Sequence, residues 1–319
     1  MPITADDITA DDITAAAARI AAQVRETPLW RVPSSALGLP DGAPPFEAWF
    51  KLEQLQRSGS FKARGMFNRL LSNPIPAAGV IAASGGNAGI ATAVAARALG
   101  VRAEIYVPGV ISAAKRARLA ALGAEVVIAG DHYADALQAC EARQRETGAL
   151  MTHAYDQPEV VAGAGTLARE IELQHGVPDS VLVSVGGGGL VAGVAAWFAG
   201  RSRVIALEPA LAPTLFNARA AGAPVDVAVS GIAADALGAR RIGRIAWDIA
   251  QQHVARCELL SDDAIREAQR FLWTELKLAV EPAAALPLAA LRSGAVRPRA
   301  GDTVCLIVCG ANLDPAMLA

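Results

Sequence analysis

The chain has 319 residues, 53% of them hydrophobic, and a formal net charge of −2 at pH 7. This composition supports a large core of one or two domains, and the balanced, dispersed charge argues against nucleic acid or an anionic membrane as a partner. No uncharged apolar run reaches 18 residues and the N-terminus is acidic, so we expect a cytoplasmic protein without a membrane span or secretion signal. Four dispersed cysteines predict reduced thiols.

The first predicted element is a capped helix near the N-terminus. The segment ITADD occupies residues 3–7 and is repeated at residues 8–12. In the second copy, Thr9, Asp11 and Asp12 precede an apolar helical pattern over residues 15–24, which predicts a cap with acidic residues in the first turn. A repeat this short is not a solenoid unit, and we assign it no function.

Apolar runs typical of buried strands then alternate with helical patterns. Strands are expected at residues 80–83, 103–108 and 125–129, and helices at residues 63–71, 88–99, 113–122 and 133–147. After a break near residues 151–158, strands are expected at 180–185, 204–207 and 303–308, with a helix at 190–199. Repeated β-α-β units with short apolar strands predict an α/β fold with mostly parallel sheets flanked by helices. Since no flexible linker divides the two sets, we expect two domains with a cleft between them.

Two motifs suggest an amine and a phosphate site. Lys62 lies at the predicted start of a helix, where the helix dipole would lower the pKa of the amine and favour a nucleophile. An isolated lysine is more often an ordinary surface residue. Four glycines, residues 186–189, join a strand to a helix and predict a cradle of N–H groups for a phosphate, with a plain glycine turn as the alternative. The segment lacks the lysine that a nucleoside triphosphate loop carries and the glycine spacing of a dinucleotide site. These differences argue against a nucleoside triphosphate as the ligand and, more weakly, against a dinucleotide.

Two further motifs follow the ends of predicted strands. Residues 84–89, Ser-Gly-Gly-Asn-Ala-Gly, can offer N–H groups and a hydroxyl to a carboxylate, although they read equally well as a helix cap. Cys309 follows the strand at residues 303–308, at the strand end where open α/β sheets place ligands. Taken alone, this thiol is more often part of an inert core.

Together these motifs resemble the fold-type II pyridoxal-phosphate enzymes, in particular the serine/threonine dehydratase family. The likeness extends from residue 27 to residue 312 and includes the segment Ser60-Phe61-Lys62-Ala63-Arg64-Gly65. Supporting matches lie at residues 163–166, 208–209, 231–235 and 281–283. The resemblance implies a fold similar to the β subunit of tryptophan synthase, with the cofactor in the cleft between two domains. Residues 1–50 and 152–319 would form the large cofactor-binding domain, and residues 51–151 the small domain.

The resemblance also implies a role for each motif. Lys62 would hold pyridoxal 5′-phosphate as a Schiff base and remove the Cα proton, with Lys62 and Ser84 as the catalytic residues. The other cofactor contacts would be Phe61, Asn87, Gly186, Gly187, Gly188, Gly189, Leu190 and Cys309. The substrate carboxylate would be bound by Ser84, Gly85, Asn87 and Ala88. Cys309 would face the pyridine nitrogen, and because a thiol cannot keep that nitrogen protonated, the ring would be a weaker electron sink.

The implied reaction is a β-elimination that converts a hydroxy-amino acid, such as L-serine, L-threonine or a 3-substituted serine, to a 2-oxo acid and ammonia. Gly85 stands where racemising relatives carry a second serine, so we expect no second base. A β-replacement enzyme similar to cysteine synthase, a racemase, and a non-catalytic amino-acid or cofactor-binding protein stay as alternatives. The β-substituent pocket is expected to include Ala88 and residues 130–134, 154–165 and 281–285. The alanine-rich segments at residues 163–165 and 283–285 are interpreted as loops that leave room for an aryl β-substituent.

Three further expectations concern ions and partners. Glu208, Ala212 and Thr214 match in spacing the oxygen ligands of a monovalent cation such as K⁺ in the family. The resemblance implies a homodimer that acts on a small-molecule amino acid, without nucleic-acid or membrane partners. Because the chain ends soon after Asn312, we expect no regulatory extension of the kind found in biosynthetic threonine dehydratases.

Overall fold

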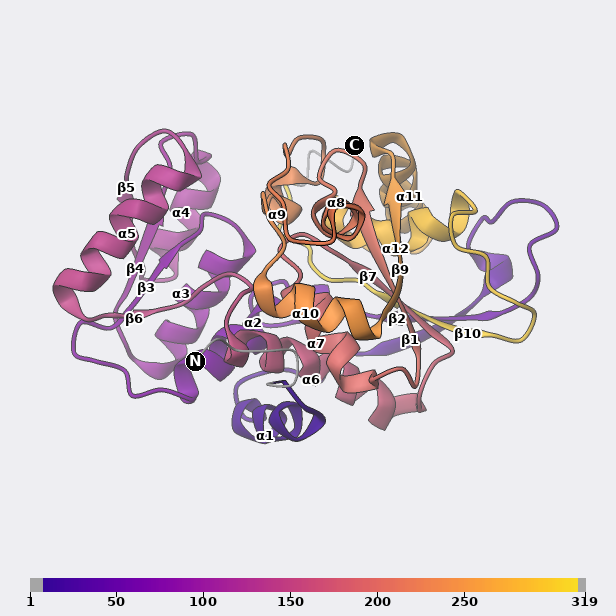
Figure 1. Cartoon of the computed structure of the whole chain (residues 1–319), viewed down its shortest axis with the longest axis horizontal. Coiled ribbons are helices and arrows are strands. Elements are labelled where there is room, and N and C mark those ends of the chain that lie inside the picture. Colours follow the sequence, from indigo (N-terminus) through magenta and orange to yellow (C-terminus); the bar gives the residue numbers. More distant parts are fainter. Residues whose placement is uncertain (1–7, 315–319) are drawn as a thin grey trace.

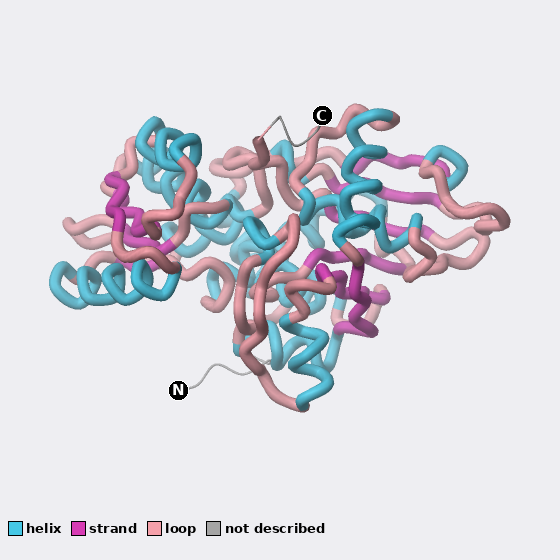
Figure 2. The backbone as a smooth tube through the Cα atoms, turned by 90° about the horizontal axis from the view of Figure 1, so that it is seen from above, coloured by secondary structure: helices cyan, strands magenta, loops and turns pink. Residues whose placement is uncertain are grey.

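Two sheets, each surrounded by helices, organise the chain. The computed structural model describes residues 8–314, so the first ITADD copy lies outside the described residues. Figure 1 shows the sheets in separate lobes, and Figure 2 shows their strands as two groups with helices and loops between them. The predicted α/β fold with two mostly parallel sheets is confirmed. The domain limits at residues 50 and 151 stay a prediction.

The larger sheet has six strands from both ends of the chain. Its order is β1 (Leu29–Pro33), β2 (Glu47–Lys51), β10 (Thr303–Ile307), β7 (Ser180–Ser184), β8 (Arg203–Pro209) and β9 (Val254–Leu260). The pair of β1 and β2 is antiparallel and the other pairs are parallel. The carboxyl ends of the parallel strands therefore meet along one edge of the sheet.

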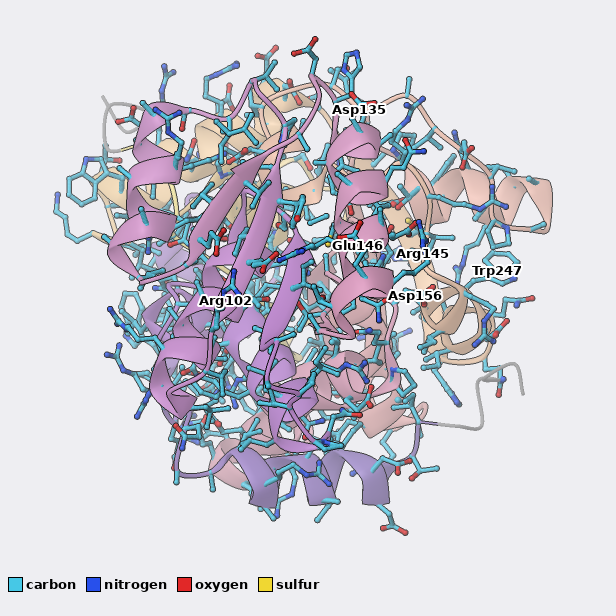
Figure 3. The ribbon with its side chains drawn as sticks, turned by 90° about the vertical axis from the view of Figure 1, so that its left-hand side faces the viewer. Arg102, Asp135, Arg145, Glu146, Asp156 and Trp247 are labelled. Carbon is cyan, nitrogen blue, oxygen red and sulfur yellow. The ribbon has the colours of Figure 1, made fainter. Side chains whose placement is uncertain are left out.

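The smaller sheet has four parallel strands, in the order β5 (Glu125–Ile128), β4 (Ala103–Val107), β3 (Val80–Ala83) and β6 (Leu150–Met151). Alternate residues of β3 serve two separate cores: Val80 packs with α3 (Asn87–Leu99), whereas Ile81 packs with α5 (Tyr133–Thr147). Helices thus cover both faces of β3, which explains why this strand is apolar throughout. In Figure 3 this lobe faces the viewer, and Asp135 and Glu146 mark the first and last turns of α5.

The remaining helices connect and cover the strands. They are α1 (Ala10–Ile20), α2 (Lys62–Leu71), α4 (Ala113–Ala121), α6 (Pro158–His175), α7 (Gly189–Phe198), α8 (Thr214–Ala221), α9 (Ala234–Leu237), α10 (Arg244–His253), α11 (Asp262–Thr274) and α12 (Pro282–Arg292), with short 3-10 turns at Ser34–Ala36 and Glu53–Leu55. Within residues 8–314, no helix has the length and apolar character needed to cross a membrane.

Two expectations about local structure need correction. The N-terminal helix has the predicted cap, with hydrogen bonds between Thr9 and Asp12 in both directions, but it ends at Ile20 and not at Val24. The N–H groups of Gln23 and Val24 both donate to the carbonyl of Ile20, which closes a turn there. The segments at residues 163–165 and 283–285 are not loops, since the first is buried within α6 and the second is buried in the first turn of α12.

Helix α2 lies where the two lobes meet. Its residues Ala63, Met66 and Phe67 belong to the core of the four-stranded sheet. A Cβ atom at Gly65 would lie 2.8 Å from the carbonyl oxygen of Val160, so the backbones of α2 and α6 are in direct contact. This contact fixes the position of Lys62, the first residue of α2, relative to the larger lobe.

Candidate active site

One cavity brings together residues from both lobes. Its walls contain Phe61, Lys62, Asn87, Tyr155, Ser184, Gly186, Gly187, Gly188, Gly189, Leu190, Ala236, Leu237, Glu281, Ala283 and Cys309. Asn87 follows β3, the glycines follow β7 and Cys309 follows β10, so each comes from the carboxyl end of a parallel strand. This is the place at which open α/β sheets bind ligands.

Lys62 contributes a buried amine to this cavity. Its Nζ donates a hydrogen bond to the carbonyl oxygen of Ala154 at 2.6 Å and lies 5.0 Å from the ring centre of Phe61. Burial lowers the pKa of Lys62 from 10.5 to about 8, against the opposing influence of Cys309 and Glu281. The pKa of Lys62 is therefore lowered, as predicted. The main cause is burial of the amine, whereas the prediction from the sequence invoked the helix dipole. Near pH 7, the neutral amine needed for nucleophilic chemistry is accessible.

The glycine segment forms the tight junction between β7 and α7. Gly188 caps α7 with a φ of +92°, and the helix begins at Gly189. A Cβ atom at Gly187 would lie 2.2 Å from the ring of Tyr155, and one at Gly188 would lie 2.4 Å from Ala246. Side chains are therefore excluded, and the backbone N–H groups at the start of α7, which lack partners within the helix, are available to an anion.

The segment predicted to bind a carboxylate joins β3 to α3. Ser84 Oγ accepts a hydrogen bond from the backbone N–H of Gly86 at 3.3 Å, and α3 begins at Asn87. Within the described chain, Asn87 lines the cavity, whereas Ser84, Gly85 and Ala88 are not among the lining residues. The structure thus brings one of these four predicted residues to the cavity wall.

Asn87 is held by two residues of the larger lobe. Its Nδ2 lies 2.8 and 3.0 Å from the two carboxylate oxygens of Glu281, and its Oδ1 accepts a hydrogen bond from Asn312 Nδ2 at 2.5 Å. Glu281 is buried, and desolvation raises the pKa of its carboxyl to about 7. A carboxyl of this kind in a cavity is typical of a functional site.

Cys309 closes the cavity near Lys62. It lies two residues beyond β10 and is buried, and its carbonyl oxygen accepts a hydrogen bond from the backbone N–H of Phe61 at 3.0 Å. Burial raises the pKa of Cys309 well above its usual value, so the side chain is a neutral thiol at physiological pH. All four cysteines of the chain are free.

The three residues predicted to bind a cation lie together behind the glycine segment. Glu208, Ala212 and Thr214 are fully buried. The carboxylate of Glu208 accepts hydrogen bonds from two N–H groups of α8 and from Cys257, and burial raises its pKa. Thr214 Oγ1 lies 2.6 Å from the carbonyl oxygen of Gly186 and 2.8 Å from Glu208 Oε1. Because a hydroxyl has one hydrogen, Thr214 can donate to only one of these two oxygens.

Several residues of the cavity wall have no individual role predicted from the sequence. Glu281 and Ala283 belong to a matching segment that is also expected to border the β-substituent, and Tyr155 belongs to residues 154–165, which are expected to border it as well. Ala236 and Leu237 were missed, although they directly follow the matching segment at residues 231–235. Of the regions expected to surround the β-substituent, residues 130–134 and 163–165 do not line this cavity within the described chain.

The cavity suits pyridoxal 5′-phosphate because it offers a different partner for each polar part of that molecule. Lys62 presents an amine for the aldehyde, and the glycine segment, which has no space for side chains, presents N–H groups for the phosphate. Asn87 is an amide donor for the ring oxygen, and the thiol of Cys309 can face the ring nitrogen.

Comparisons with known proteins point to the same cofactor. Residues 20–310 match the family described as "Pyridoxal-phosphate dependent enzyme". Phenylserine dehydratase of Ralstonia pickettii is 36% identical over 95% of this chain and 92% of its own length. L-threonine ammonia-lyase of Geobacter sulfurreducens is 37% identical over 93% of this chain and 73% of its own length.

Solved structures share the fold along nearly the whole chain. A threonine deaminase from "T.th." has a TM-score of 0.87 at 35% identity, covering 96% of this chain and 99% of that chain. Serine racemase of maize has a TM-score of 0.89 at 30% identity, and the match covers 98% of this chain and 96% of the racemase chain. Family match, relatives and cavity agree, and the chain belongs to the fold-type II pyridoxal-phosphate-dependent enzymes and, within them, to the serine/threonine dehydratase family.

Proposed function

We propose that this enzyme is an ammonia-lyase that removes the β-hydroxyl of a hydroxy-amino acid and releases a 2-oxo acid and ammonia. The observation that carries the proposal is the convergence of Lys62, the glycine segment, Asn87 and Cys309 on one cavity. The names of the relatives, phenylserine dehydratase and L-threonine ammonia-lyase, support a hydroxy-amino acid as the substrate class. L-serine, L-threonine and 3-substituted serines are the proposed substrates.

When bound, pyridoxal 5′-phosphate supplies an electron sink for the negative charge that develops at Cα. Lys62 Nζ, whose pKa burial lowers to about 8, is the base that takes the Cα proton. When the cofactor is bound, Phe61 would lie against its ring and Cys309 would face the ring nitrogen. The phosphate would be held by Gly186, Gly187, Gly188, Gly189 and Leu190. The buried thiol stays neutral, so it offers the nitrogen no ionic partner.

The substrate is proposed to lie at the start of α3. Backbone N–H groups there, with the hydroxyl of Ser84, bind the substrate carboxylate, because a helix N-terminus favours an anion. Gly85, Asn87 and Ala88 complete this site in the proposal. Gly85 cannot act as a second base on the opposite face of Cα, which favours elimination over racemisation.

A bound ion, a cellular compartment and an oligomeric state are also proposed for the enzyme. A monovalent cation such as K⁺ fits among the oxygens of Glu208, Ala212 and Thr214, where a buried carboxylate and two crowded oxygens are present. Four free cysteines support a reducing compartment, the cytoplasm. The assembly is proposed to be a homodimer, which light scattering of the purified enzyme would show.

One assay of the purified holoenzyme tests the function. Serine, threonine, 3-hydroxyaspartate and phenylserine are each supplied, and 2-oxo acid and ammonia are measured in potassium and in sodium buffer. We expect both products from at least one substrate, with the higher rate in potassium. Lys62→Ala should abolish turnover and change the absorbance of the bound cofactor. Lys277→Ala, which removes an exposed lysine, is the matched control and should leave both unchanged.

Other outcomes identify the alternatives. Product that forms only with an added sulfur nucleophile would indicate β-replacement, and loss of optical purity without 2-oxo acid would indicate a racemase. Cofactor binding without any conversion would indicate a binding protein. An unaltered cofactor spectrum in Lys62→Ala would contradict the central role of this lysine.

A further inference from the structure

Glu281 is a buried carboxyl in the cavity wall that has no part in the proposed reaction. It lies directly before α12, and its backbone N–H donates to the carbonyl oxygen of Gly310 at 3.1 Å. Its side chain binds Asn87, which starts α3 in the other lobe. The contact therefore joins the two lobes inside the cavity.

The hydrogen bonds from Asn312 and to Glu281 fix which end of the Asn87 amide carries the oxygen and which carries the nitrogen. Asn312 Nδ2 donates to Asn87 Oδ1 and also to the carbonyl oxygen of Ser58 at 3.0 Å, so the oxygen end of the amide is fixed. Both oxygens of Glu281 lie within 3.0 Å of Asn87 Nδ2, and one N–H pointing between them satisfies both. The second N–H of this amide is then left for another acceptor.

Two glycines are required for this arrangement to fit. A Cβ atom at Gly310 would lie 2.4 Å from Glu281 Oε1, and one at Gly59 would lie 2.5 Å from Asn312 Oδ1. Gly59 also has a φ of +77°, which L side chains rarely adopt. The backbone is thus shaped closely around the two side chains that hold Asn87.

Charged and titratable groups surround Glu281 on every side. Lys62 of α2 favours its ionised form, whereas Asp235 of α9 opposes it. Cys309, beyond β10, interacts with Glu281 as a neutral thiol. Lys115 of α4 forms an ion pair with Asp235, so a residue of the smaller lobe partly neutralises that charge.

On the basis of the proposed function, we propose that Glu281 is a positioning residue that, in its ionised form, orients the Asn87 amide so that its second N–H is left for the ring oxygen of the cofactor. Protonation of Glu281 removes the charge and one acceptor oxygen, and Asn87 is then held less firmly. Since the pKa of Glu281 is about 7 in this structure, the change falls near neutral pH. The environment of the cofactor should therefore depend on pH through Glu281.

The test follows the absorbance of the bound cofactor between about pH 5 and about pH 9, without substrate. The wild-type holoenzyme should show a pH-dependent transition within this range, because burial raises the pKa of Glu281 from its ordinary value. Glu281→Gln should remove this transition and raise the cofactor dissociation constant about tenfold, the effect of losing one well-placed hydrogen bond. A transition that persists unchanged in Glu281→Gln would overturn the proposal.

Two further variants keep the test decisive if Glu281→Gln does not fold. Asp235→Asn removes a negative charge and should lower the midpoint, because Asp235 raises the pKa of Glu281. Lys115→Met breaks the same ion pair but leaves Asp235 charged, so it should not lower the midpoint. Equal midpoints in the wild type and Asp235→Asn would refute the role of Glu281. This test measures no turnover, so its result is independent of the proposed function. If the absorbance transition disappears in Glu281→Gln but the wild-type protein has no lyase activity, this inference is supported and the proposed function is refuted.

Discussion

Lys62 illustrates how a group needed for chemistry can lower the stability of the fold. Its folded pKa of about 8 lies below its ordinary value of 10.5 because the amine is buried. Between these values the folded chain binds fewer protons than the unfolded chain, so its stability rises as pH increases through this range. Below about pH 8 the ligand-free protein carries an unfavourable buried ammonium.

We predict that Lys62→Met makes the ligand-free protein more stable at pH 7. The substitution removes the buried charge, and we expect a gain on the order of 1 kcal/mol after the loss of the hydrogen bond to Ala154. Thermal unfolding at pH 7 and pH 10 measures the effect. The advantage of the variant should shrink at pH 10, where the wild-type amine is neutral. A variant that is less stable at pH 7 would show that burial of this charge is not unfavourable.

At the level of single residues, the sequence indicates local motifs better than contacts between residues that are far apart in the chain. Lys62, the glycines at residues 186–189 and Cys309 could be predicted to share a cavity because their motifs occur together in the order of the family that the sequence resembles. The contact between Glu281 and Asn87 could not be predicted, because the two residues are 194 positions apart in the sequence. Neither the local pattern nor the residue type reveals that contact.

Among the elements, α6 determines where α2 and therefore Lys62 can lie. A Cβ atom at Gly163 of α6 would lie 2.6 Å from the carbonyl oxygen of Arg64 in α2. On its other side, a Cβ at Gly165 would lie 2.9 Å from the carbonyl oxygen of Gly193 in α7. Backbone atoms cannot yield as a flexible side chain can, so these glycines set the spacing of three helices.

We predict that Gly163→Ala destabilises the protein by about 1–3 kcal/mol, the usual cost of overpacking a core. Because α2 must move to make room, the affinity for the cofactor should fall as well. Leu173→Ala on the same helix is the control, since Leu173 is 68% exposed and should cost less than about 0.5 kcal/mol. Urea unfolding and cofactor titration measure the two effects. Unchanged cofactor affinity in Gly163→Ala would show that α6 does not position Lys62.

Elements with a regular apolar pattern were predicted well, and those with a special packing role were not. The helices expected at residues 88–99 and 133–147 begin within one residue of their observed starts, and Gly100 and Gly148 end them in the left-handed conformation. Residues 163–165 were expected to form an alanine-rich loop, whereas they lie inside α6. The close approach of α2 and α7, which requires glycine here, is not visible in a local pattern.

Across the whole molecule, a buried ionic network connects the two lobes close to the site. Arg64 of α2 forms two hydrogen bonds with Glu53, at 2.7 and 2.8 Å, and an ion pair with Glu170 of α6 at 3.0 Å. Glu170 also accepts a hydrogen bond from Lys51 of β2 at 2.5 Å. Arg64 and Glu53 are almost fully buried, so each depends on the other for compensation of its charge.

We predict that Arg64→Met destabilises the protein by about 3–5 kcal/mol, because it leaves Glu53 charged, buried and without its main partner. Arg31→Met is the matched control. It breaks an ion pair with Glu47 of similar geometry, but Arg31 is 57% exposed, so the loss should stay below about 1 kcal/mol. Urea unfolding of both variants at neutral pH measures the difference. Adding Glu53→Gln to Arg64→Met should recover part of the loss, since the orphaned charge is then removed. Equal losses in Arg64→Met and Arg31→Met would show that the network does not stabilise the junction of the lobes.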